Sequence, residues 1–377
     1  MTCGHASRQS ELHLTEAADA PPVSQEVSEP GHCLSPGILT ITHEVIVLVT
    51  FREYPDREVL RRSHDGGGRS VRTKTLRTAL VANAVFSALT GAALLVFGEP
   101  IAGWIGVGTP FVHRILGGAL LVFAGFVAWT GTRRAVDTFR AALISLADFS
   151  WVIGTVVLIL MTLGTLEAHA ILALLAIAAA VLFFGLRQLQ GIGELYRDAN
   201  GSRAHVLCLE VESPVAPERL WPRVADLRGI GRYAPKLARV VLREDTEPGV
   251  DAVRECTDTG GRTWAERCRR FDPDELLLEF EFLADEPGFP FPFETMSGGW
   301  EIEPCGSGST VIVWFTVTPK YGLAHPFVLA MMARKLTTDM GAVVARMSSA
   351  ARSEAVDRDA IVARDGDAAC HSSATEP

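Results

Sequence analysis

Two charged residues on neighbouring predicted strands, Glu266 and Arg254, have side chains that suit proton transfer or the anchoring of a polar ligand group. Glu266 alternates with Trp264 and Cys268, so these three side chains share one face of a strand. If that face is buried, the carboxylate is placed to act as a general base or as a hydrogen-bond anchor. A register shifted by one residue would turn Arg267 and Arg269 to that face instead.

A second candidate lies in an apolar region. Asp148 is the one formal charge within a predicted membrane span, and intramembrane carboxylates often serve as proton relays or ion ligands. The alternative is a structural role, in which Asp148 accepts a hydrogen bond from Asn83 or Ser145, or pairs with Arg140. Asn83 and Asp148 are therefore the polar membrane residues that the sequence singles out.

Several kinds of chemistry have no support in the sequence. It contains no Ser-His-Asp set, no glycine-rich phosphate loop and no histidine cluster at metal-ligand spacing. The seven cysteines lie far apart without a Cys-x-x-Cys pair, so we expect no zinc site, no disulfide framework and no cofactor. The formal charge of −9 argues against nucleic acid as a partner.

Four apolar stretches between charged residues are each long enough to cross a bilayer, which takes about 20 residues. They are residues 78–98, 115–132, 141–166 and 168–186. Small residues recur every fourth position in the first, at Asn83, Ser87 and Gly91, and Gly117 and Gly125 form a similar stripe in the second. Such stripes predict close helix packing.

The loop charges predict the orientation of these spans. Positive residues gather before the first span, between the second and third, and after the fourth: Arg57, Arg61, Arg62, Arg69, Arg72, Lys74, Arg77, Arg133, Arg134, Arg140, Arg187, Arg197 and Arg203. The other two loops carry Glu99, Arg114 and Glu167 as their only formal charges. Because positive loops stay inside, the sequence predicts a multi-pass integral protein of the plasma or inner membrane with both termini cytoplasmic.

After Ala204 the pattern becomes that of a soluble α+β domain. Alternating residues predict strands at 205–211, 238–243, 251–257, 262–271, 275–283, 296–303 and 310–318. Two short helices follow the first strand, the first over 217–227, and a long helix over about 326–350 closes the domain with an apolar stripe.

This order of elements, and several of its residues, resemble the START-like or SRPBCC superfamily, also called the polyketide cyclase and lipid-transport family. The resemblance covers roughly residues 204–350. It is carried by the string from Val211 to Trp221, by Ala225-Asp226-Leu227, Tyr233, Pro235, Trp264, Glu266 and Arg267, and by Trp300 before Gly306–Thr310.

The resemblance implies a helix-grip fold, in which a curved antiparallel sheet wraps around the closing helix and leaves an apolar cavity. The methionines of that helix and the stiff loop Pro287–Phe293 suit such a site, since thioethers adapt to varied ligands. The predicted ligand-binding residues are Trp264, Trp300, Phe289, Phe291, Met332, Leu336 and Met340.

We therefore predict a four-helix transmembrane bundle followed by a helix-grip domain. The divisions are a mostly disordered, basic-ended extension over 1–75, the bundle over 76–190, a linker over 191–203, the domain over 204–352 and a disordered tail over 353–377. Within the extension, the apolar run 38–51 predicts an interfacial helix or a strand.

The leading interpretation of function is a membrane-tethered cytoplasmic module that binds a hydrophobic small molecule: a lipid, an acyl chain or a polyketide-like ring. One alternative is a cyclase or dehydratase that uses the carboxylate of Glu266 together with Arg254, without metal or nucleotide. Another is a regulatory domain on a four-helix membrane protein in which Asp148 does the essential work. The oligomeric state is open.

Overall fold

A computed structural model of the chain describes the backbone of residues 38–42, 45–49, 67–198, 202–243, 247–322 and 324–372. Side chains are described between Thr73 and Glu354 within those ranges. Residues 1–37 of the predicted, mostly disordered extension over 1–75 therefore lie outside the described residues.

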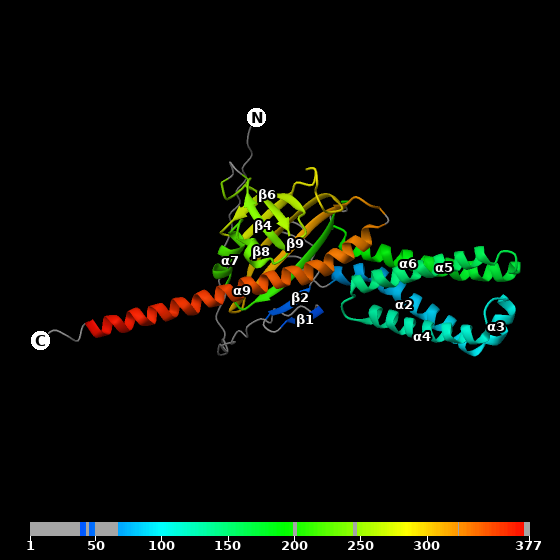
Figure 1. Cartoon of the computed structure of the whole chain (residues 1–377). Coiled ribbons are helices and arrows are strands. Elements are labelled where there is room, and N and C mark those ends of the chain that lie inside the picture. The colour runs from blue at the N-terminus through cyan, green and yellow to red at the C-terminus, as the bar shows by residue number, and fades with distance from the viewer. Residues whose placement is uncertain are drawn as a thin grey trace, which may run out of the picture. The chain divides into compact units, whose positions relative to one another are not determined.

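Residues 67–196 form the helical part of the chain (Figure 1). Its helices are α2 (Gly67–Val96), α3 (Gly98–Ile105), α4 (Pro110–Thr132), α5 (Thr138–Met161) and α6 (Ala168–Tyr196). Four of them are long and apolar enough to span a membrane: Thr73–Val96, Pro110–Thr132, Thr138–Met161 and Ala168–Tyr196. The short helix α3 was not expected, and the polar end of α6 extends beyond the predicted span.

Glycines let α2 and α4 approach closely. A Cβ atom added at Gly117 would lie 2.6 Å from the backbone oxygen of Gly91, and one added at Gly91 would lie 2.8 Å from the backbone oxygen of Gly117. Gly125, in contrast, faces open space. The small-residue stripe thus packs at Gly91 and Gly117, as predicted, but not at Gly125.

Polar residues close one end of the bundle. Arg77 of α2 donates hydrogen bonds to the carbonyl oxygens of Gly131, Arg133 and Arg134, which satisfies the free carbonyls at the end of α4. Asp137 caps the start of α5 by accepting from the backbone N–H groups of residues 139 and 140.

The second part of the chain is an antiparallel sheet with three helices. The strands are β3 (His205–Ser213), β4 (Leu237–Leu242), β5 (Val253–Asp258), β6 (Thr263–Asp272), β7 (Leu277–Phe282), β8 (Phe293–Cys305) and β9 (Gly308–Pro319). The helices are α7 (Pro217–Ala225), α8 (Ile230–Tyr233) and α9 (His325–Ser372). All seven predicted strands are present, and the helix-grip prediction is confirmed.

One region takes the predicted strand alternative rather than a helix, and one element differs from the expectation. The run 38–51 contains two strands, β1 (Ile38–Thr42) and β2 (Val45–Val49), and β2 extends the sheet by pairing with β3. Helix α9 continues to Ser372, into the predicted disordered tail. Alanine, arginine and glutamate favour helix even where no apolar stripe marks one.

The sheet order is β1-β2-β3-β9-β8-β7-β6-β5-β4, and α9 crosses one face of this sheet (Figure 1). Leu329, Ala333, Val343, Val344 and Met347 of α9 are buried in the main hydrophobic cluster. Near its start α9 also contacts the bundle, where the rings of Phe327 and Phe149 lie 6.5 Å apart between centroids. The guanidinium of Arg334 lies 4.7 Å from the ring centroid of Phe139.

The crossing of α2 and α4 gives a first prediction. Gly117→Ala places a methyl group against a backbone oxygen, which cannot move without shifting a helix, so we expect a loss of about 1–3 kcal/mol of stability. Thermal unfolding of the full chain in detergent measures it. Gly125→Ala, on the same helix in open space, is the matched control and leaves the melting temperature unchanged or slightly higher. Equal melting temperatures for the two variants would contradict the close crossing.

Candidate functional site

The strand register decides which way Glu266 points. Arg254 of β5 lies directly opposite Glu266 of β6, and Glu266 lies opposite Phe282 of β7. Directly opposed residues in an antiparallel sheet share a face. This face, which we call the inner face, contributes Glu266, Phe282 and Met296 to the buried interior. The register is thus the one that puts the carboxylate inside rather than Arg267 and Arg269.

Glu266 and Arg254 form a buried ion pair. The Nε and Nη2 atoms of Arg254 lie 2.7 and 2.6 Å from Oε2 of Glu266, and Arg254 and Glu266 are 6% and 5% exposed. The indole Nε1 of Trp264 donates to Oε1 at 2.6 Å. Both carboxylate oxygens therefore accept hydrogen bonds, and the guanidinium also lies 3.7 Å from the ring centroid of Phe280.

An aromatic ring from the loop between β7 and β8 contacts the tryptophan that binds Glu266. Phe291 contacts Trp264 edge to face with centroids 5.3 Å apart, and it contacts Phe289 at the same distance. Phe291 also lies 6.2 Å from Phe282 of the inner face. Phe291, one of the loop residues predicted to bind a ligand, thus stacks on Trp264, which donates a hydrogen bond to the carboxylate.

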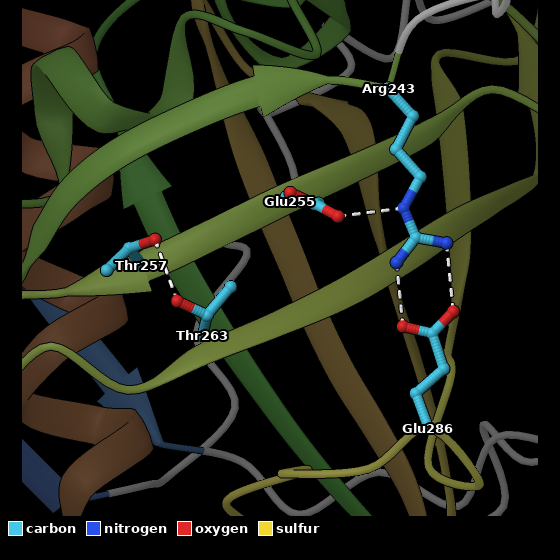
Figure 2. Close-up of polar contacts among 5 residues, drawn as sticks. All are labelled: Arg243, Glu255, Thr257, Thr263 and Glu286. Atoms are coloured by element: carbon cyan, nitrogen blue, oxygen red, sulfur yellow. Dashed lines mark hydrogen bonds and ion pairs between the residues drawn. The ribbon is translucent and has the colours of Figure 1, made fainter.

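Ion pairs of Arg243 with Glu286 and Glu255, which we call the clasp, connect this loop to the sheet surface (Figure 2). Arg243, directly after β4, donates through Nη1 and Nη2 to both carboxylate oxygens of Glu286 at 2.8 and 2.7 Å, and through Nε to Glu255 of β5 at 2.9 Å. Arg243 holds the pKa of the Glu286 carboxyl below its usual range. Charge alternation along the chain did not point to this clasp, because its partners come from three separate segments.

The remaining predicted ligand residues lie in the same interior. Trp300 and Leu336 are buried in the main hydrophobic cluster, and Met332 and Met340 pack against it. Met331, which precedes Met332 on α9, is 61% exposed and lies outside the interior. The seven predicted residues thus all belong to this one hydrophobic cluster or pack against it.

The two thiols on the inner face, those of Cys256 and Cys268, are buried and have raised pKa values. Cys256 and Cys268 are free, whereas Cys305 is disulfide-bonded. Burial raises the pKa of the Cys268 thiol to about 11 and raises the pKa of the Cys256 thiol further. Because the thiolate is the nucleophile, neither thiol is activated for covalent catalysis.

Asp148 and Asn83 meet in the bundle interior. Oδ2 of Asp148 accepts from Asn83 Nδ2 at 2.8 Å and from Gln188 Nε2 at 3.0 Å. Ser145 donates to Gln188 rather than to Asp148, and Arg140 pairs with Asp137. Gln188 was not identified from the sequence, because the predicted fourth span ends at Leu186, before the charged Arg187. In the structure, α6 continues to Tyr196 and includes Gln188.

A histidine pair lies where the domain begins. His205, the first residue of β3, is buried, and its ring centroid lies 5.0 Å from that of His325 at the start of α9. Burial, the charge of His325 and the charge of Arg197 lower the pKa of His205 to about 4. The folded chain therefore keeps His205 neutral at pH values where a free histidine is protonated.

The domain after the helical bundle matches a known protein family. A family model described as polyketide cyclase / dehydrase and lipid transport matches residues 205–352, which confirms the resemblance seen in the sequence. No curated protein matches the chain.

Several solved structures align with about two fifths of the chain. They include Ara h 8.0201 at 18% identity, covering 39% of this chain and 99% of that one with a TM-score of 0.32. The Zhui aromatase/cyclase from Streptomyces sp. R1128 aligns at 16% identity over 38% and 93%, with a TM-score of 0.32. A protein from Thermus thermophilus aligns at 16% identity over 40% and 98%, also with a TM-score of 0.32.

The buried ion pair gives a second prediction. Glu266→Gln or Arg254→Met leaves a buried charge without its partner, and we expect each to lower the free energy of unfolding by about 3–5 kcal/mol. The double variant loses less than the sum of the two, as denaturant unfolding of the full chain in detergent will measure. Glu281→Gln breaks the exposed pair with Arg269 and serves as the control, with a loss of about 0–1 kcal/mol. A Glu266→Gln variant of full stability would show that the fold does not need the pair.

His205 gives a prediction of pH dependence. Between about pH 6.5 and pH 4 the unfolded chain takes up a proton at this residue and the folded chain does not. The stabilisation is therefore complete above about pH 6.5 and decreases as the pH falls toward 4, by on the order of 3 kcal/mol. Unfolding measured across this range shows a shallower slope of stability against pH for His205→Asn than for the unmodified chain. Identical slopes for His205→Asn and the unmodified chain would refute the assignment.

Proposed function

We propose that residues 205–352, a domain of the polyketide cyclase/dehydrase and lipid-transport family, bind a hydrophobic small molecule between the inner face of the sheet and α9. Ligands of suitable chemistry are a lipid, an acyl chain or a polyketide-like ring. The four apolar helices hold this domain at the cytoplasmic face of a membrane.

The observation that carries the proposal is the composition of the interior. Its charged side chains, Arg254 and Glu266, bind each other, and Glu266 also accepts a hydrogen bond from Trp264. The surface that remains for a ligand is therefore aromatic and aliphatic. The methionines of α9 that pack against this surface, Met332 and Met340, adjust their rotamers to ligands of different shape. A neutral apolar ligand fits such a lining best.

Access would come through the aromatic loop. The ion pair between Arg243 and Glu286 holds that loop at a partly exposed position, where water and salt weaken it. Opening the clasp would release Phe289 and Phe291 from the inner face while leaving the sheet paired. This geometry supports a loop that opens for ligand exchange.

The occupied carboxylate gives less support to a cyclase. A general base needs a free lone pair within reach of the substrate, and both oxygens of Glu266 already accept hydrogen bonds. Catalysis at Glu266 would require a substrate to reach a remaining lone pair of a carboxylate that is 5% exposed and ion-paired with Arg254. We therefore favour binding over turnover.

The membrane orientation follows from charge and connectivity. The loop between α4 and α5 carries Arg133 and Arg134, Arg140 follows it, and this is the end of the bundle where α6 leads into β3. Positive loops stay on the cytoplasmic side, so the domain would face the cytoplasm. Tethering raises the effective concentration of a cavity next to a ligand that dissolves in the bilayer.

A matched pair of substitutions on α9 tests the proposal. Met340→Trp fills the interior, and we expect at least a tenfold loss of saturable binding of a dansyl-labelled undecanoic acid to the full chain in phosphatidylcholine nanodiscs. Met331→Trp adds the same ring at an exposed position and leaves binding unchanged. Probe fluorescence above that of empty nanodiscs is the measurement.

Two results would count against hydrophobic binding by the domain. One is the absence of saturable binding above empty nanodiscs, together with solvent extracts of the purified chain that contain only the nanodisc lipid. The other is an equal loss of binding in both variants, which would place the probe away from the interior.

A further inference from the structure

The four-helix bundle contains a cavity of its own. Its volume is about 210 Å³, and residues of α2, α4, α5 and α6 line it. The lining is mostly apolar and includes the rings of Phe86, Phe123 and Trp151. Since pockets for drug-sized ligands span roughly 300–1,000 Å³, this cavity suits a smaller molecule.

The polar part of the lining consists of one buried carboxylate, that of Asp148, and the hydroxyl groups of Ser87 and Thr90. Asp148 is 3% exposed, and both of its hydrogen bonds, from Asn83 and Gln188, reach the same oxygen, Oδ2. Among the residues that the structure describes, Oδ1 has no hydrogen-bond partner. An acceptor held this way inside a membrane helix is costly to leave unsatisfied.

An unsatisfied donor lies close by on the same helix. Trp151 follows Asp148 by three positions, so the two side chains are neighbours on one face of α5. The indole Nε1 of Trp151 is buried and has no hydrogen-bond partner among the described residues. The site therefore combines an acceptor and a nearby donor that have no partner among the described residues with the hydroxyl groups of Ser87 and Thr90, in an otherwise apolar lining.

The carboxylate of Asp148 and the indole N–H of Trp151 favour a ligand that can both donate and accept a hydrogen bond. We propose that the bundle cavity binds a small apolar alcohol or phenol, whose hydroxyl donates to Oδ1 of Asp148 and accepts from Nε1 of Trp151. An ammonium group would satisfy Asp148 but offers no lone pair to the indole N–H. A hydrocarbon would satisfy neither group.

The cavity has an opening on the bundle surface. Ala119 of α4 and Ala147 of α5 are exposed and also line the cavity. In a membrane that surface faces lipid, so a molecule dissolved in the bilayer reaches Asp148 without crossing water. This site is separate from the one between the sheet and α9, and neither proposal depends on the other.

Three matched probes test the proposal: 4-propylphenol, its methyl ether 4-propylanisole, and propylbenzene. Binding to the full chain in phosphatidylcholine nanodiscs is measured by equilibrium dialysis against empty nanodiscs of the same lipid. We expect saturable binding of the phenol at least tenfold tighter than that of the ether or the hydrocarbon. Equal binding of the three probes, or a preference for the ether, would overturn the proposal.

Substitutions locate the site. Asp148→Asn keeps an oxygen for Asn83 and Gln188 but turns an amide toward the cavity, so the preference for phenol over ether disappears. Ala147→Phe blocks the opening of the cavity, so we expect it to abolish phenol binding. This variant tests the site even if Asp148→Asn does not fold. Ser150→Ala, at an exposed position of α5, changes nothing. Loss of phenol binding in Met340→Trp but not in Ala147→Phe would place the probe in the domain and refute a bundle site.

Discussion

Burial of helix α9 is the constraint on which the rest of the fold depends. Its apolar stripe, centred on Leu336 and Val343, lies against the inner face of the sheet, and this interior continues into the bundle in one hydrophobic cluster. Near its start the same helix contacts α5 through Phe327 and Phe149. Because close-packed interiors transmit displacement, a change in the position of α9 would be felt both in the domain and at the base of the bundle.

The buried carboxylates of Glu266 and Asp148 each accept hydrogen bonds from two nearby side chains. Whether these bonds leave an oxygen atom without a partner determines which ligand each proposed site would take. In the domain, Arg254 and Trp264 use both oxygens of Glu266, so the inner face offers a ligand mainly apolar contact. In the bundle, Asn83 and Gln188 use only one oxygen of Asp148. The same residue chemistry therefore supports apolar binding in one place and recognition of a hydroxyl group in the other.

Much of the candidate site was predictable from local pattern. Alternation put Trp264, Glu266 and Cys268 on one face, and proline spacing marked the loop with Phe289 and Phe291 as an irregular connection. Pattern did not reveal which face was inward, since a shift of one residue exchanges the faces. Nor did it reveal the clasp of Arg243 with Glu286, because a contact between distant segments leaves no periodic trace.

The sequence by itself determined the architecture: four apolar spans with their charged loops, seven strands and a closing helix, all of which follow from short-range periodicity and from the cost of placing charge in lipid. Only the tertiary structure decided that the carboxylate of Glu266 is occupied and that, among the described residues, Oδ1 of Asp148 is not. The physical reason is that the state of a buried polar group depends on its partners in space. Those partners came from residues distant in the chain and, for Gln188, from a helix longer than its hydropathy suggested.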